Sequence, residues 1–147
     1  DRPGYSPEYH DPAFMKLVED CCCDLVGKDR VKFDYESWST GSSDFGDVTC
    51  VMPGVQFFAA GAIGTGHGID YYVKDPNRMC VNAVKAQLFV ADALLRDDAA
   101  SARKIIADYK PQYPSIKAYL DAINELFLDK DAVQYDEHGN ATVDFQN

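Results

Sequence analysis

One histidine stands in a glycine-rich turn, where an imidazole can bind a metal ion or act as a general base. His67 lies between Gly66 and Gly68, so the backbone on both sides can approach a ligand closely. The apolar run Val55–Ala60 precedes this turn, and a long helical pattern follows it from about Pro76. A loop between a strand and a helix is where α/β enzymes keep their chemistry. The sequence therefore favours a site at His67. A metal ion needs three or four ligands, and His67 is one. The alternative interpretation, that His67 is a loop histidine with a structural role, stays open.

A second turn of chemical interest comes earlier, where Asp44 and Asp47 flank a Phe-Gly pair. Acidic pairs in a glycine turn bind a metal or cap a helix, and capping is the more common fate. Beyond His67, Asp70, Tyr71 and Tyr72 are candidates for contacting a metal ligand or forming a substrate wall. These two turns hold the chemistry-bearing side chains whose positions matter most.

The other polar side chains give weaker signals. Ser42 and Ser43 have no Gly-x-Ser-x-Gly sequence around them, so a serine nucleophile lacks support. His10 and His138 have no ligand partner at a suitable spacing, and His138 falls at the tip of an expected hairpin. The sequence has no His-Glu-x-x-His, no P-loop and no Rossmann glycine fingerprint. These absences leave His67 as the leading candidate.

The five cysteines include three consecutive ones, Cys21, Cys22 and Cys23. Successive residues on a helix are turned by about 100°, so these thiols cannot bind one metal ion together. With no Cys-x-x-Cys spacing, we interpret the cysteines as reduced, buried and apolar. Free thiols fit a reducing cytoplasm, which is the location that we expect.

Charge and length narrow the classes of partner. The 147 residues correspond to one domain and include 24 acidic against 14 basic side chains, a formal net charge of −10. Such a surface repels phosphate backbones, which argues against nucleic acid. The sequence has neither a basic amphipathic face nor a long apolar run, so it gives no support to membrane binding. The chain starts at Asp1 without an initiator Met, which we interpret as a fragment or processed product.

The apolar spacing predicts the elements that must position these turns, in an α/β arrangement. Asp11-Pro12 and Gly27 bracket a first helix, and Asp75-Pro76 starts a later one. The remaining expectations are strands at Val31–Phe33 and Val55–Ala60, a short helix or turn within Asp44–Met52, a loop at Gly61–Lys74, a buried helix at Met79–Leu95, helices at Asp98–Tyr109 and from Pro114, and a hairpin within Ala132–Phe145. The helix that follows Pro114 has the stripe Ile116, Tyr119, Leu120, Ile123 and Phe127.

The two turns and the run between them resemble a known enzyme family. The stretches are Ser42–Thr49, Met52–Gln56 and Gly64–His67. They resemble the C-terminal segment of zinc- or manganese-dependent amidohydrolases, the aminoacylase and carboxypeptidase-like metallopeptidases. The nearest branch looks like the p-aminobenzoyl-glutamate and indoleacetyl-amino-acid hydrolases. Met79–Ala86 is similar to the family's following helix, and Arg2–Tyr5 resembles the re-entry into its catalytic domain.

The resemblance implies roles for a few residues. His67 matches the C-terminal metal-ligand histidine, while Asp44, Gly66 and Gly68 match positions that shape the site. The cofactor implied is Zn or Mn, and the substrate is a small N-acyl amino acid. In the whole protein, a two-metal site would activate water and polarise the scissile amide carbonyl. The family's other ligands and its glutamate base have no counterpart here, so we expect the isolated chain to be inactive.

The resemblance also implies what surrounds the chain. Residues 1–147 match the C-terminal portion of a mixed-sheet, phosphorylase/hydrolase-like catalytic domain, helix-rich with a few strands and a C-terminal hairpin. The N-terminal half and the dimerisation domain lie outside these residues, and the full-length protein is expected to be a homodimer. An open strand edge and a bare helix face around Val84 and Leu88 should then cause self-association or leave the chain only marginally stable. The alternatives are a non-catalytic α+β interaction domain and a degenerate family member that binds its ligand without hydrolysis.

Overall fold

The computed structural model describes residues 5–35, 43–127 and 131–143. Within these ranges the chain is helix-rich, with four α-helices and two small antiparallel sheets. In chain order the elements are α1 (Pro12–Val26), η1 (Lys28–Arg30), α2 (Phe45–Thr49), β1 (Ala62–Ile63), β2 (Tyr72–Val73), η2 (Asn77–Val81), α3 (Asn82–Asp108), α4 (Ile116–Glu125), β3 (Val133–Tyr135) and β4 (Ala141–Val143). No helix in these ranges has the length and apolar character needed to cross a membrane.

The first helix begins and ends where local signals predict. The Asp11 carboxylate accepts a hydrogen bond from the Phe14 N–H at 2.9 Å, and Pro12 occupies the first turn. Gly27 ends α1 with a φ of 90°, a conformation that favours glycine. The prediction of this helix is confirmed, because each signal acts within a few residues of the helix end.

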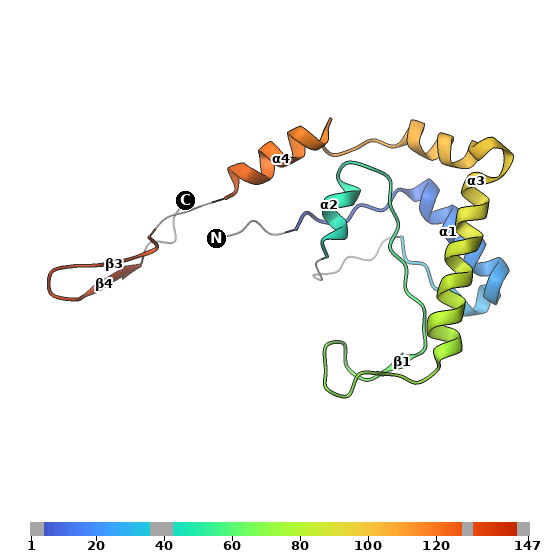
Figure 1. Cartoon of the computed structure of the whole chain (residues 1–147), viewed down its shortest axis with the longest axis horizontal. Helices are drawn as coiled ribbons and strands as arrows, with labels where there is room; N and C mark the ends of the chain where they lie inside the picture. Colours follow the sequence, from blue (N-terminus) through green and yellow to red (C-terminus); the bar gives the residue numbers. More distant parts are fainter. Residues whose placement is uncertain (1–4, 36–42, 128–130, 144–147) are drawn as a thin grey trace.

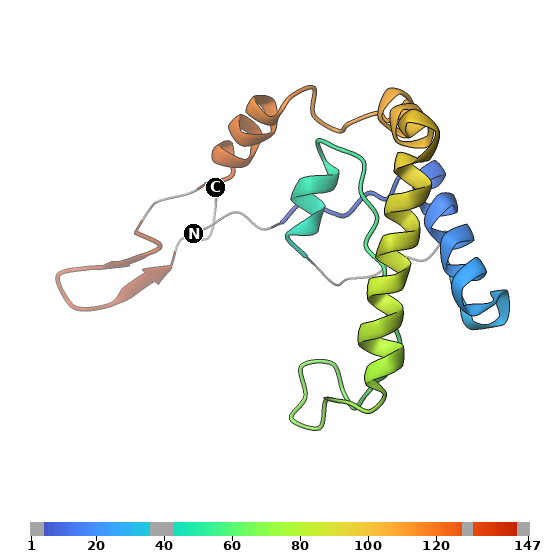
Figure 2. The same cartoon turned by 45° about the vertical axis from the view of Figure 1, so that its right-hand side comes forward.

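The core lies between α1 and α3, which run side by side in both views (Figures 1 and 2). Val18, Cys21 and Val90 form its buried centre. Val55 and Phe57, from the segment that precedes β1, pack against this centre. These contacts join three separate parts of the sequence through side chains alone.

The two predicted strands that precede the His67 turn are not formed. Residues 53–61 and 31–34 lie in no sheet, so the predictions of strands at Val55–Ala60 and Val31–Phe33 are wrong. A strand needs a hydrogen-bonding neighbour, and the described residues provide none for either segment. The apolar composition of Val55–Ala60 is used for packing on α1 and α3 instead.

The predicted loop at Gly61–Lys74 contains a short hairpin. Ala62 pairs with Val73 and Ile63 with Tyr72 in an antiparallel register. The Gly61 C=O also accepts hydrogen bonds from the Lys74 N–H at 2.8 Å and the Asp75 N–H at 2.9 Å. This hairpin separates the His67 turn from the rest of the molecule, at the lower end of α3 in Figure 1.

The long third helix is two helices joined by a sharp bend. Residues 96–99 leave the helical conformation, and Asp97, Asp98 and Ala99 have φ angles of 53°, 57° and 57°. The predicted division between Met79–Leu95 and Asp98–Tyr109 is therefore confirmed. The prediction that the first of these helices is buried is wrong, because only Ala86 and Val90 are buried in it. Leu88 is 63% exposed, and Val84 is exposed as well.

The C-terminal elements lie away from the core (Figure 1). Ser115 caps α4 by accepting from the Ala118 N–H at 3.1 Å, which confirms the helix predicted from Pro114. The predicted apolar stripe of α4 remains largely open, with Ile116, Leu120 and Phe127 exposed. The expected hairpin forms between β3 and β4, in register from Val133↔Val143 to Tyr135↔Ala141.

Candidate functional site

His67 occupies the apex of the turn between β1 and β2. Its side chain is exposed, and its φ of 63° places it in the left-handed region that non-glycine residues seldom adopt. The Gly68 N–H donates to the Thr65 C=O at 2.7 Å, and the Tyr71 N–H donates to the Gly68 C=O at 3.1 Å. The turn is therefore ordered by its own hydrogen bonds, and these fix the backbone that carries the imidazole.

Asp70 closes this turn with its carboxylate. Both of its oxygens lie 3.2 Å from the Thr65 nitrogen, and Oδ2 lies 3.4 Å from the Thr65 hydroxyl. Asp70 was a candidate for contacting a metal ligand or substrate, and in the structure it bonds to the loop itself. Its position three residues after His67 makes it the side chain that holds the two ends of the turn together.

The glycines beside His67 differ in how much space surrounds them. A Cβ atom on Gly68 would lie 2.4 Å from Asp70 Oδ1, whereas a Cβ atom on Gly66 would meet nothing within 4 Å. Gly64, which the sequence analysis did not select, has a φ of 98°, and a Cβ atom there would lie 2.2 Å from the Asp70 C=O oxygen. Gly64 and Gly68 are the glycines that the loop needs, and the positive φ of Gly64 is a signal that sequence alone does not carry.

The acidic turn has a different function in the fold. Asp44 precedes α2 but its side chain makes no cap hydrogen bond, and Asp47 Oδ1 accepts from the Ser6 N–H at 2.8 Å. The interpretation of these two carboxylates as helix caps is therefore wrong. Gly46 allows the close approach of the N-terminal segment, since a Cβ atom there would overlap the Ser6 C=O oxygen at 1.8 Å. Ser42 and the segment Arg2–Gly4 lie outside the described residues.

Helix α2 is also the point at which the C-terminal part attaches. The Tyr109 hydroxyl donates to the Thr49 C=O, and the Gln112 N–H donates to the Cys50 C=O at 3.0 Å. Burial, followed by the nearby Asp47 carboxylate, raises the pKa of Tyr119 to about 12. The acidic turn therefore joins residues from both ends of the chain, which is a structural role.

The two turns are not brought together. Helix α2 and the β1–β2 turn lie at different ends of the segment that links them, in both views (Figures 1 and 2). Among the described residues, no three His, Cys, Asp or Glu side chains are placed to hold a metal ion. His67 offers an accessible nitrogen for one coordination bond, and the described residues do not fit a complete metal site.

The cysteines are free, as expected. Cys21 and Cys50 are buried, Cys22 and Cys23 are half-buried, and Cys80 is exposed. Burial raises the pKa of the Cys21 and Cys22 thiols, and neighbouring charges add to the effect. Protonated, buried thiols pack as small apolar groups, so the interpretation is confirmed for Cys21 and Cys50 and is wrong for Cys80.

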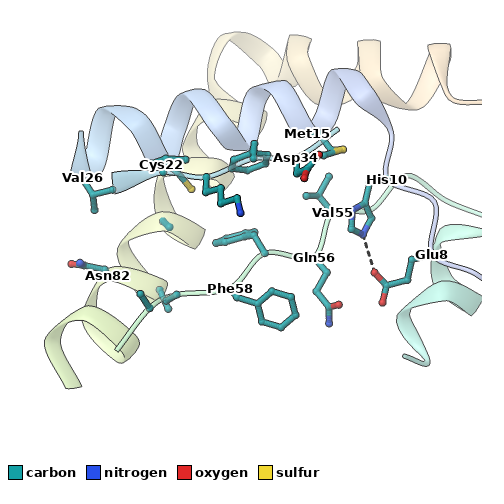
Figure 3. A pocket seen from close by; sticks show the side chains of 18 of the residues that line it. Glu8, His10, Met15, Cys22, Val26, Asp34, Val55, Gln56, Phe58 and Asn82 are labelled. Carbon is teal, nitrogen blue, oxygen red and sulfur yellow. Dashed lines mark hydrogen bonds and ion pairs between the residues drawn. The ribbon is translucent and has the colours of Figure 1, made fainter. Parts of the chain in front are cut away.

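A groove of about 1120 Å³ lies between α1, residues 31–34 and the extended segment that precedes β1 (Figure 3). At one end, His10 Nε2 lies 3.0 Å from Glu8 Oε2. Sequence reasoning found no partner for His10, although the Glu-x-His spacing is local enough to suggest one. His138 is exposed at the tip of the C-terminal hairpin, where we predicted it.

Comparisons with family models, with curated proteins and with solved structures find no match to this chain.

Proposed function

We propose that this chain forms part of a metal-dependent amidohydrolase and that His67 supplies one metal ligand. The substrate is a small N-acyl amino acid or a p-aminobenzoyl-glutamate type of amide, and the metal is Zn or Mn. The residues that support this proposal are the two turns and the apolar run between them, which resemble the family's C-terminal segment. Neither nucleic acid nor a membrane is a partner in this proposal.

The observation that carries the proposal is the construction of the His67 turn. An exposed imidazole stands at the apex of a loop closed by Asp70, in a conformation that depends on Gly64 and Gly68. A loop that only reverses the chain has no need to hold a histidine at positive φ, which costs of order 1–3 kcal/mol. A loop whose backbone is held by its own hydrogen bonds loses little conformational freedom when its histidine binds a metal ion, so this geometry favours a ligand role.

The remaining ligands and the general base come from residues outside this chain. The proposal places them there because no three candidate ligands are grouped in the described part of the chain. In this proposal the chain is the C-terminal portion of a mixed-sheet catalytic domain in a cytoplasmic homodimer. The exposed Phe58 and Leu88 side chains are surfaces that the rest of the domain would cover.

The test uses a polypeptide that contains these residues together with the segment that carries the other ligands. We expect it to hold zinc or manganese and to hydrolyse p-aminobenzoyl-glutamate, whereas His67→Ala loses both bound metal and turnover. His138→Ala is the matched control, because His138 is an exposed turn histidine without a proposed ligand role. Turnover by His67→Ala at the unsubstituted rate would exclude the proposal.

A second candidate is a non-catalytic α+β interaction domain, or a degenerate family member that binds an acyl amino acid without cleaving it. The groove beside α1 and the separation of Asp44 from His67 favour it. In that case the longer polypeptide lacks bound metal, and His67→Ala changes neither its metal content nor its partners. The metal measurement therefore distinguishes the two candidates.

A further inference from the structure

One eight-residue segment makes no backbone hydrogen bonds with the other residues that the structure describes. Within the described ranges, the N–H and C=O groups of residues 53–60 have no backbone partner, whereas the next residue, Gly61, accepts two. Unpaired backbone groups in an extended segment are a template for pairing with another strand. The segment therefore has backbone N–H and C=O groups with which no other described part of the chain pairs.

The two faces of this segment differ. Val55 and Phe57 pack against the α1–α3 core, while Phe58 is 85% exposed. In Figure 3 the side chains of Gln56 and Phe58 point away from α1. This alternation has the period of a β-strand, so the backbone is already held in a form that can accept a partner without rearrangement of its core side chains.

The composition of the segment favours pairing with an identical segment. Residues 55–60 read Val-Gln-Phe-Phe-Ala-Ala, with no charge and no proline. Short segments of high β-propensity, low charge and no proline form sheets between identical chains. No like charges would therefore face each other along two paired copies.

Charges beside the two ends of the segment are complementary. Glu8 lies near the Gln56 end of the groove (Figure 3), where its carboxylate contacts His10. At the other end Gly61 abuts Met79, and the neighbouring Arg78 lines the groove. Arg30, Lys32 and Asp34 also line it, and the Asp75 carboxylate accepts from the Arg78 N–H. An antiparallel pair would bring Glu8 of one copy toward Arg78 of the other.

We propose that residues 55–60 form an antiparallel strand pair with the same residues of a second copy of this chain. Such a pair is two-fold symmetric, so each copy donates and accepts the same hydrogen bonds. This association does not depend on the proposed metal chemistry, and either proposal can fail without the other.

The test measures mass in solution as a function of concentration by light scattering or sedimentation. We expect the wild-type mass to rise from 16.3 kDa toward twice that value as the concentration increases. Gln56→Pro and Ala59→Pro remove N–H groups on opposite edges of the strand. A strand pair uses one edge only, so one of these variants should reduce association and the other should not, and neither should unfold the monomer. The monomer loses no backbone hydrogen bond between described residues in these variants, because Gln56 and Ala59 form none with them. Gln56→Ala keeps the N–H and serves as the matched control.

Two further variants keep the proposal open to failure. Phe58→Asp places a charge on the exposed face and should also leave only the monomer, whether or not a proline variant folds. Leu88→Asp changes the bare face of α3 and should leave association unchanged. The proposal is overturned if the wild type stays monomeric at high concentration, if both folded proline variants associate as strongly as the wild type, or if Leu88→Asp alone dissociates the pair.

Discussion

Two neighbouring stretches of the chain differ in how their backbone N–H and C=O groups are hydrogen-bonded. The Gly61–Lys74 stretch pairs with itself through β1 and β2 and closes its turn with Asp70, so its order is local. Residues 53–60, immediately before it, are held only by side chains that pack on α1 and α3. The first stretch keeps its conformation through its own hydrogen bonds. The backbone groups of the second stretch are hydrogen-bonded only when another strand lies beside it.

This difference bears on how a functional loop is built. The turn that presents His67 depends on few residues outside itself, so it can keep its conformation when the surrounding domain is altered or incomplete. The extended segment depends on distant residues, and its final structure is set by whichever polypeptide pairs with it. The following predictions test that contrast, beginning with the largest expected effect.

Val18→Ala should separate the two stretches most strongly. Val18 is 1% exposed at the centre of the core against which Val55 and Phe57 pack. Removing two buried methyl groups should lower the free energy of unfolding by about 2 kcal/mol. Hydrogen exchange followed by NMR should show faster exchange in α1 and α3 and an unchanged rate at Gly68. Equal acceleration in the turn would show that its order is not local.

Gly64→Ala should disrupt the His67 turn while leaving the core intact. The new Cβ atom would collide with the Asp70 backbone, and alanine disfavours the φ of 98° at this position. We expect a local loss of about 1 to 2 kcal/mol, measured as loss of protection in the β1–β2 hairpin. Gly66→Ala is the control, since the added methyl group meets no atom within 4 Å. Equal effects of the two substitutions would contradict the geometry.

Asp70→Ala should loosen the turn by a smaller amount. It removes the acceptor of the Thr65 N–H, and we expect exchange of that amide to accelerate by about fivefold, the equivalent of one ordinary hydrogen bond. Asp70→Asn keeps one acceptor oxygen and should restore part of the protection. An unchanged rate in Asp70→Ala would mean that backbone bonds alone hold the turn.

Phe58→Ser should have the smallest effect on the monomer. With 85% of its side chain exposed, Phe58 contributes little packing, and the free energy of unfolding should stay within about 0.5 kcal/mol of the wild type. Denaturant unfolding at low protein concentration measures this value. A loss above 1 kcal/mol would show that the exposed ring supports the fold.

The sequence predicts the parts of this fold that depend on nearby residues. Asp11 and Gly27 define α1, and the turn around Asp136 defines the C-terminal hairpin, because caps and turns act over a few positions. The strand predicted at Val55–Ala60 is not formed, because a strand exists only with a hydrogen-bonding neighbour. The apolar pattern is the same whether that neighbour is present or absent.

The candidate site shows the same division. His67 and its glycines stand out in the sequence, but the bond from Thr65 to Asp70 depends on the path of the loop. The hydrogen bond from the Ser6 N–H to the Asp47 carboxylate joins residues 41 positions apart, and no local sequence pattern predicts it. The residue types show where polar groups gather along the sequence. The separation of Asp44 from His67 depends on the path of the whole chain, which the residue types do not show.

The bend at residues 96–99 determines the reach of the molecule. A straight helix from Arg96 to Tyr109 would carry its end roughly 20 Å further along the axis of the first half, at 1.5 Å per residue. The bend redirects that length, so that the Tyr109 hydroxyl meets the Thr49 carbonyl instead of solvent. Because α4 follows this second half of α3, a change of a few degrees in the bend would move the start of α4 by ångströms.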